Sequence, residues 1–449
     1  MTAPARTAAY HALRAVTADA QDLPVALAHS RRSLEDERDR ALAAEIVTGT
    51  LRWLRSLDFL VEHFAGRRLA KIDREVLIIL RLSLYQLLHL DRVPAAAVVD
   101  DAVDLTRAAR KPSATGFVNA VLRSVLRQRS KLPLPPRPTA ADDRSAQLAY
   151  LGITHSHPEW LVARWLDRHG FDAAEAWVRF NNATPALTLR VNTLRATVDD
   201  AVRALADMGV ETERGRYAPE GLVVVEGNPL RHRQDGLVVV QDEASQLVPL
   251  LVDAHPGERV LDLCASPGGK TLALAAAMRD EGTLVASDVR ARRIDLLRDT
   301  IHTSGARSVQ VLQVGTAGAL PFDGAFDRVL VDAPCSGLGT IRRDPDIRWR
   351  RQEVDLRTLA ARQIELLDRA AVSVRAGGRL VYATCSSEPE ENEEVVDAFV
   401  AAHPEFTVVD PRPHLPEAVR PLVDDRGLFR TLPFRDGLEA FFAVALRKQ

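Results

Sequence analysis

The chain has 449 residues, of which 46% are apolar and 27% charged, so we expect a globular protein of about two to four domains. The formal net charge of -2 excludes a globally basic nucleic-acid-binding protein, and any RNA contact must come from local patches. The N-terminus has no apolar signal core, and no run of about 18 apolar residues follows it, so we expect a cytoplasmic protein without membrane contacts.

Residues 1–131 are predicted to form a compact all-α domain. Stretches such as residues 4–20, 37–66, 73–90 and 114–131 place apolar residues three and four positions apart, the spacing of an amphipathic helix. This part holds 21 Lys and Arg against 15 Asp and Glu, a net charge of +6, and its densest basic stretch runs from Arg107 to Lys131 and includes Lys111. On charge alone, RNA contact and a solvated helix face are equally open interpretations of this stretch.

The middle of the chain begins with a proline-rich linker over residues 132–144. Residues 145–240 then read as a small α+β module, with two helices followed by short apolar strands and another helix. From residue 241 to residue 449, strands and helices alternate, which predicts an α/β domain with a mostly parallel, doubly wound sheet. Ligands bind such sheets beyond the carboxyl ends of the strands, and the motifs described next all lie there.

The first motif is LDLCASPGGKT, residues 261–271, in which a strand leads through Gly268 and Gly269 into a helix beginning near Lys270. Glycines let a ligand approach the backbone, and the helix N-terminus offers free N–H groups. A P-loop would need an earlier glycine, so that class of NTPase is excluded. Asp288 ends the next strand, about 20 residues on, where an acid can bind two ribose hydroxyls. The alternatives are a tight strand-to-helix turn and an ordinary helix N-cap.

The three cysteines, Cys264, Cys335 and Cys385, are too few and too widely spaced for a disulfide framework or a zinc site, and we expect no metal. A rare cysteine is most often a small buried residue. Cys264 ends its strand and is interpreted as packing. Cys335 and Cys385 instead follow their apolar strands, in the polar segments LVDAPCSG and LVYATCSSEPEEN, so both should reach the same rim of the sheet.

Two thiols beside a nucleoside cofactor suggest methylation of a pyrimidine at carbon 5. This carbon is a poor nucleophile until a thiolate adds to carbon 6, so one cysteine would be a covalent catalyst. The ring must then lose the carbon 5 proton and expel the thiol, and the second thiol or another base could assist. Asp332 could bond to the exocyclic amine or to N3, which would favour cytosine.

These motifs also carry a family resemblance. The stretches CASPGGKT, DAPCSGLGTIRRDPDIRW and YATCSSEPEENEEVV resemble the Nol/Nop/Sun family of RNA (cytosine-5-)-methyltransferases, which use S-adenosylmethionine. The region from LRWLRSLDFLVEHF to LRLSLYQLLHLDRVPAAAVVDDAV is similar to the NusB-like RNA-binding domain. That pairing is typical of the RsmB (Sun/Fmu) branch, which methylates 16S ribosomal RNA. It implies a NusB-like domain, an RRM-like α+β module and a Rossmann-like catalytic domain that act on RNA. We expect a monomer.

The resemblance also implies residue roles. Cys385 would be the nucleophile and Cys335 would assist release, the reverse of DNA cytosine methyltransferases, so the motif around Cys385 argues for RNA. Asp332 would lie between the methyl donor and the base, and Asp288 would bind the ribose. The segment holding the cofactor would comprise Cys264, Ala265, Ser266, Pro267, Gly268, Gly269 and Lys270.

One position departs from the family pattern, and one basic segment stays open to two interpretations. The usual acid after the strand VQVL is replaced by Gly315, so Thr316 or backbone groups would take its place, or the cofactor would bind less tightly. Arg342, Arg343 and Arg348 follow Cys335 closely and are expected to hold RNA phosphates; the alternative is a solvated loop. The same reaction on transfer RNA and a non-catalytic RNA-binding assembly factor are the alternative functions.

Overall fold

The computed structural model describes residues 2–19, 21–139, 143–231 and 236–449. Contacts divide the chain into two compact units, of which the first contains Met1–Ala183 and the separate segment Ile341–Arg350. The second contains Thr184–Thr340 and Arg351–Gln449. Within the described ranges, no helix combines the length and the apolar character needed to span a membrane.

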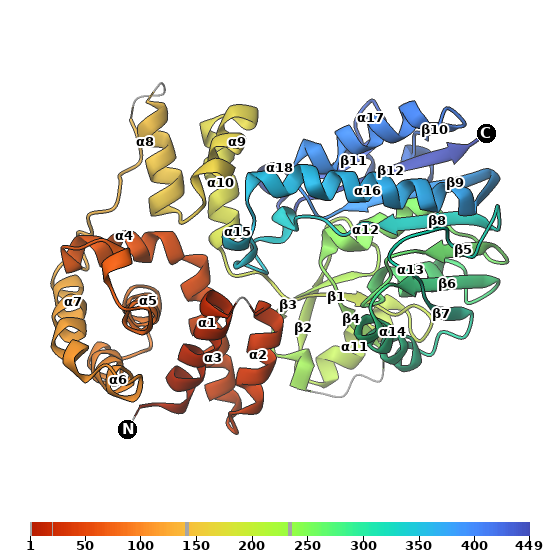
Figure 1. The fold of residues 1–449 in the computed structure, drawn as a ribbon. Coiled ribbons are helices and arrows are strands. Elements are labelled where there is room, and N and C mark those ends of the chain that lie inside the picture. Colours follow the sequence, from red (N-terminus) through yellow and green to blue (C-terminus); the bar gives the residue numbers. More distant parts are fainter. Residues whose placement is uncertain (1, 20, 140–142, 232–235) are drawn as a thin grey trace. The chain divides into compact units, whose positions relative to one another are not determined.

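The described part of the first unit is helical (Figure 1). Its helices are α1 (Pro4–Ala18), α2 (Leu23–Arg32), α3 (Glu37–Arg52), α4 (Leu54–Ala65), α5 (Arg74–His89), α6 (Ala95–Ala108), α7 (Thr115–Arg127), α8 (Arg144–Ala149), α9 (Glu159–His169), α10 (Phe171–Asn182) and the short α15 (Ile347–Arg350). The helix expected over residues 37–66 is interrupted at Trp53, whose φ of -102° and ψ of 15° end α3 and begin α4. The predicted all-α N-terminal domain is confirmed.

The sequence predicts a module boundary near residue 145, but the helices beyond it pack with the N-terminal ones. Both α9 and α10 belong to the first unit. The stacked rings of Trp165 and Trp177, 4.5 Å apart and both fully buried, join these two helices to each other. Local periodicity predicts each helix but does not specify which unit buries its apolar face.

The second unit begins with a small antiparallel sheet in the order β2-β3-β1-β4. Its elements are β1 (Thr188–Val191), α11 (Val198–Asp207), β2 (Glu211–Arg214), β3 (Gly221–Glu226) and β4 (Val238–Val240). A capping box begins α11, in which Thr197 and Asp200 each bond the other's backbone N–H. Sequence reasoning predicted every element of this list except β2, whose residues are mostly exposed and lack an apolar alternation.

The large sheet of the second unit has the order β10-β12-β9-β8-β5-β6-β7, with β11 paired to β12. Its strands are β5 (Arg259–Asp262), β6 (Thr283–Asp288), β7 (Val309–Gln313), β8 (Phe326–Asp332), β9 (Val374–Thr384), β10 (Phe406–Val409), β11 (Leu428–Thr431) and β12 (Phe441–Lys448). The pairs among β5 to β9 are parallel, and β12 is antiparallel to β9. The mostly parallel, doubly wound sheet is therefore confirmed.

Helices cover both faces of this sheet (Figure 1). They are α12 (Glu243–Val252), α13 (Gly269–Ala277), α14 (Ala291–Ser304), α16 (Glu353–Ser373), α17 (Glu393–Ala402) and the short α18 (Pro433–Asp436). Adjacent strand residues face opposite sides, so Val260 lies in the core that includes α12 and α13, and Leu261 in the core that includes α16 and α17.

The strand order changes direction at β5, which has β6 on one side and β8 on the other. In doubly wound sheets such a switch leaves a crevice beyond the carboxyl ends of the two strands. Cys264 follows β5 and Asp332 ends β8, so the sequence motifs meet at this crevice.

Candidate active site

The two polar-segment cysteines lie side by side. The sulfur atoms of Cys335 and Cys385 are 3.3 Å apart, within hydrogen-bonding reach. The neighbouring parallel strands β8 and β9 set this approach, because Asp332 is in register with Ala383 and each thiol follows within three residues. The third cysteine, Cys264, packs partly against the core under α16, and burial raises the pKa of its thiol.

The surroundings of the two neighbouring thiols differ in charge. The hydrogen bond with Cys385 raises the pKa of Cys335, and burial and the negative charge of Glu391 raise it further. Lys270 lies on the Cys385 side. Burial alone would lower the pKa of the Lys270 ammonium, but Asp332 and, to a smaller degree, Cys385 outweigh burial and raise it.

The carboxylate of Asp332 forms a salt bridge with Lys270. Lys270 Nζ donates to Asp332 Oδ2 at 2.7 Å, and the Asp332 side chain remains 28% exposed. The bond joins the helix that follows β5 to the end of β8. It therefore fixes the carboxylate while leaving part of it accessible.

A hydrogen-bond network that sequence reasoning missed connects the two cysteine loops. Glu391 is fully buried, and its Oε1 accepts from the backbone N–H of Ser336 at 2.8 Å. Its Oε2 accepts from the Ser386 hydroxyl at 2.6 Å. Asn392 receives a bond from Thr384 at 2.6 Å and donates to the Ser386 carbonyl at 3.0 Å. The sequence signal for this network is the run PEEN close behind Cys385.

Buried polar residues stabilise the glycine turn and the end of the strand that leads into it. Gly268 has a φ of 109°, a left-handed conformation that favours glycine, and a Cβ there would come within 3.0 Å of Leu297. Arg190 of β1 donates to the Gly269 carbonyl at 3.0 Å. At the end of β5, burial raises the pKa of Asp262 to about 7, and Thr271 donates to it at 2.7 Å.

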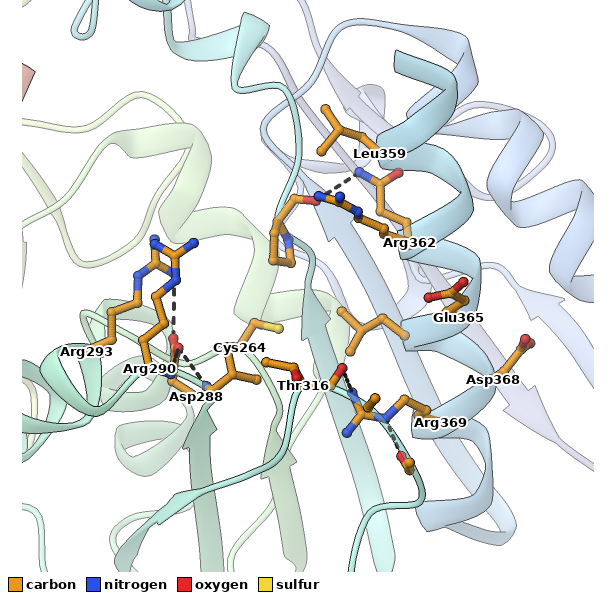
Figure 2. A pocket seen from close by; sticks show the side chains of 16 residues that line it. Cys264, Asp288, Arg290, Arg293, Thr316, Leu359, Arg362, Glu365, Asp368 and Arg369 are labelled. Atoms are coloured by element: carbon orange, nitrogen blue, oxygen red, sulfur yellow. Dashed lines mark hydrogen bonds and ion pairs between the residues drawn. The ribbon is translucent and has the colours of Figure 1, made fainter. Parts of the chain in front are cut away.

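A cavity of about 750 Å³ opens beside this turn (Figure 2). Its lining residues are Cys264, Asp288, Val289, Arg290, Arg293, Thr316, Ala317, Gly318, Pro334, Leu359, Arg362, Gln363, Glu365, Leu366, Asp368 and Arg369. Figure 2 shows Asp288 and its arginines on one side, residues of α16 on the other, and Cys264 with Thr316 between them. Pro334, directly before Cys335, connects the cavity to the thiol pair.

Asp288 presents an unusual carboxylate to this cavity. Its Oδ1 accepts from the backbone N–H groups of Val289 and Arg290, at 2.8 and 3.2 Å. Its Oδ2 is buried and has no hydrogen-bond partner in the described part of the chain, with Arg293 3.6 Å away. A buried unsatisfied acceptor is costly, so this oxygen is suited to a ligand hydroxyl.

The cavity lining overlaps only partly with the predicted cofactor segment. Cys264 and Asp288 line it, but the described residues 265–270 do not, and Lys270 instead contacts Asp332. The α16 side of the cavity was not predicted, because helix residues without a motif carry no sequence signal for a site.

The loop that carries Gly315 in place of an acid is tied down by α16. Arg369 donates to the carbonyls of Gly315 and Gly318, at 2.8 and 2.7 Å, and to that of Thr316 at 3.3 Å. Thr316, which the sequence offers as one replacement for the missing acid, lines the cavity.

The prediction that Arg348 holds RNA phosphate is wrong for this structure. Its side chain is fully buried and donates to the Ser156 carbonyl at 2.9 Å and to Asn182 Oδ1 at 3.0 Å. The segment Ile341–Arg350 belongs to the first unit, and Arg348 anchors it there. The sequence position of Arg348 near Cys335 suggested a ligand role, but Ile341–Arg350 belongs to the first unit and not to the unit that contains the large sheet.

The other predicted RNA contacts are only partly exposed. The Arg342 guanidinium lies 4.3 Å from the centre of the Phe180 ring, and its Nε donates to the Ala183 carbonyl at 3.3 Å. Arg343 is half-buried. Lys111 pairs with Asp73, and its side chain is 36% exposed. Their contacts with RNA stay predictions.

Comparisons with known proteins agree across the chain. Family models described as "NusB family", "Methyltr_RsmF/B-like, ferredoxin-like domain" and "16S rRNA methyltransferase RsmB/F" match residues 3–127, 157–231 and 249–447. Ribosomal RNA small subunit methyltransferase B of Pseudomonas putida is 36% identical over 403 residues, covering 89% of each chain.

Two solved structures share the fold of this chain. A crystal structure of the protein PH0851 is 27% identical, with a TM-score of 0.81 over 100% of this chain and 99% of that one. A methyltransferase homolog protein from Pyrococcus horikoshii is 27% identical, with a TM-score of 0.57 over 67% of this chain and 99% of its own.

Proposed function

Because the chain belongs to the RsmB/F family of S-adenosylmethionine-dependent methyltransferases of small-subunit ribosomal RNA, we propose that it methylates carbon 5 of a cytosine in 16S ribosomal RNA through a covalent bond to Cys385. The observation that carries this proposal is the 3.3 Å separation of the Cys335 and Cys385 sulfur atoms. An isolated thiol would serve as a simple nucleophile, whereas a pair suits a reaction with separate attack and release steps.

The cavity fits a nucleoside cofactor in size and in chemistry. Its volume of about 750 Å³ lies in the range of small-molecule sites. The unsatisfied Oδ2 of Asp288 can accept from ribose hydroxyls, and Cys264 and Thr316 line the cavity nearby. S-adenosylmethionine, when bound there, supplies an electrophilic methyl group.

Replacing Asp288 with asparagine is expected to raise the KM for S-adenosylmethionine roughly 10- to 100-fold, since a hydrogen bond to a charged group contributes about 1.5–3 kcal/mol. The kcat should change little, because Asp288 follows a different strand from either thiol. Asparagine keeps an oxygen for the Val289 and Arg290 N–H groups. Steady-state kinetics check this, with Asp295→Asn on the exposed face of α14 as control. An unchanged KM would remove Asp288 from the cofactor site.

The thiol that attacks the base must be a thiolate, and the raised pKa of Cys335 argues against Cys335 as the attacking group. The Lys270 ammonium interacts with Cys385, and Cys335 can donate its proton to the Cys385 sulfur as a hydrogen bond. A new bond from Cys385 Sγ to carbon 6 would shift the ring electrons toward carbon 5. Carbon 5 could then form a bond to the methyl carbon, while the bond from that carbon to the donor sulfur breaks and leaves its electron pair on sulfur. Asp332, held by Lys270, is suited to bond the exocyclic amine or protonated N3 of cytosine.

Release reverses the covalent step. The carbon 5 proton leaves to a base, its electron pair restores the ring double bond, and the bond from carbon 6 to Cys385 breaks with its electrons returning to sulfur. A hydrogen bond from the Cys335 thiol stabilises the departing thiolate. The second cysteine therefore acts on the leaving group.

The function can be tested with the full-length protein and unmodified small ribosomal subunits, free 16S RNA and transfer RNA. Each is incubated with S-adenosylmethionine carrying a labelled methyl group, and the RNA is digested for mass spectrometry. We expect labelled 5-methylcytidine from the ribosomal RNA. Label only in transfer RNA, or on another atom, would contradict the proposal, and no label in any RNA would favour an RNA-binding assembly factor.

A further inference from the structure

The carboxylate of Glu391 contacts the residue behind each catalytic thiol. Ser336 follows Cys335 and Ser386 follows Cys385, and both donate to Glu391, at 2.8 and 2.6 Å. Gln363 of α16 donates to the same carboxylate at 3.0 Å. The two serine hydroxyls are 3.2 Å apart. One buried side chain thus joins the two cysteine loops and the helix that covers them.

The structure gives this carboxylate no cation to neutralise it. Glu391 is fully buried, and no salt bridge involves it in the described part of the chain. Two of its three side-chain partners are N–H groups, which can only donate. A buried charge of this kind acts strongly on near neighbours, because little water screens it.

We propose that Glu391 is a positioning residue, which holds the two cysteine loops together and keeps the Cys335 thiol protonated beside Cys385. The importance of this role for catalysis rests on the proposed function, whereas the effect of Glu391 on the Cys335 thiol does not. Negative charge beside Cys335 opposes its ionisation. A thiol that keeps its proton is the donor within the pair, a choice that the distance between the sulfur atoms leaves open.

A substitution can separate the charge of Glu391 from its shape. In Glu391→Gln, the amide oxygen can still accept from Ser336 and Gln363, and the amide nitrogen can donate to the Ser386 hydroxyl, which is able to reverse. Glu391→Asp keeps the charge but shortens the side chain, so it disturbs the hydrogen bonds more. Glu394→Gln, an exposed position three residues on, removes an equal charge and serves as control.

The test measures alkylation of each cysteine by iodoacetamide in the full-length protein at pH 8, followed by mass spectrometry of the peptides. In the unmodified protein and in Glu394→Gln, Cys385 should react faster than Cys335. Glu391→Gln should reduce this preference about tenfold, the change that one pKa unit produces. Glu391→Asp should have a lower melting temperature, yet its Cys335 should still be alkylated slowly.

Three results would overturn the proposal. The first is an unchanged ratio of the Cys385 and Cys335 alkylation rates in Glu391→Gln, and the second is an absence of Cys335 alkylation in that variant. The third is an equal increase of the Cys335 alkylation rate in Glu391→Gln and Glu391→Asp, which would mean that loosened loops and not the lost charge expose the thiol. If Glu391→Gln does not fold, fast alkylation of Cys335 in the folded Glu391→Asp variant would contradict the proposal. The assay needs neither RNA nor cofactor, so its failure is distinct from failure of methyl transfer. In an active enzyme, Glu391→Gln should lower kcat about tenfold and leave the KM for RNA unchanged.

Discussion

Replacing Cys385 with alanine is expected to abolish methyl transfer, by a factor on the order of 10⁴ or more, while RNA binding is retained. Removal of a covalent nucleophile eliminates the whole reaction path, whereas binding depends on the rest of the surface. Cys385→Ser should be equally inactive, since a hydroxyl of similar size is a far weaker nucleophile. Its thiol makes one hydrogen bond, to Cys335 at 3.3 Å, among those of the described residues, so the fold should survive the change.

This prediction is checked by single-turnover incorporation of labelled methyl groups together with a filter-binding measurement of RNA affinity. Loss of both activity and binding would mean that the substitution damages the fold. Retained activity in either variant would show that Cys385 is not the nucleophile.

Replacing Cys335 with alanine is expected to have the opposite signature, in which attack proceeds but release slows by about 10²-fold or more. Without the Cys335 thiol, the departing Cys385 sulfur loses its hydrogen-bond donor, and the bond to carbon 6 persists. A covalent protein–RNA species should accumulate and remain visible as a slower band on a denaturing gel. Turnover beyond the first cycle should nearly stop.

The matched control is the double variant Cys335→Ala with Cys385→Ala, which has no attacking sulfur and should form no such band. A covalent band with Cys385→Ala and none with Cys335→Ala would reverse the two roles. The 3.3 Å distance between the two sulfur atoms does not show which one attacks, and this chemical test does.

The sequence was most informative where a motif coincides with the end of an apolar strand. The runs leading to Cys264, Asp288, Asp332 and Cys385 predict parallel strands, and parallel strands deliver their following residues to one edge of the sheet. For this reason the approach of Cys335 and Cys385 could be expected before the register of β8 and β9 was known. The all-α domain followed in the same way from helical periodicity.

Prediction failed where a residue's role depends on distant partners. Arg348 stands beside a catalytic motif in the chain, yet its partners Ser156 and Asn182 lie more than a hundred residues away in sequence. The predicted phosphate ligand is therefore a buried anchor. The strands β10, β11 and β12 were not predicted either, and only β10 is mostly exposed, with little of the apolar pattern that marks a central strand.

The amino-acid sequence by itself determined which chemical groups the chain possesses and at which strand ends they emerge, because side-chain periodicity and turn residues act over a few positions. Only the tertiary structure decided which groups share a charge or a proton. Glu391 opposite Ser336 and Ser386, Lys270 on Asp332, and Arg369 under the Gly315 loop are all set by strand pairing and helix packing. Burial then makes those contacts strong, because electrostatic interactions increase where water is excluded, and no local pattern in the chain specifies which contacts will be buried.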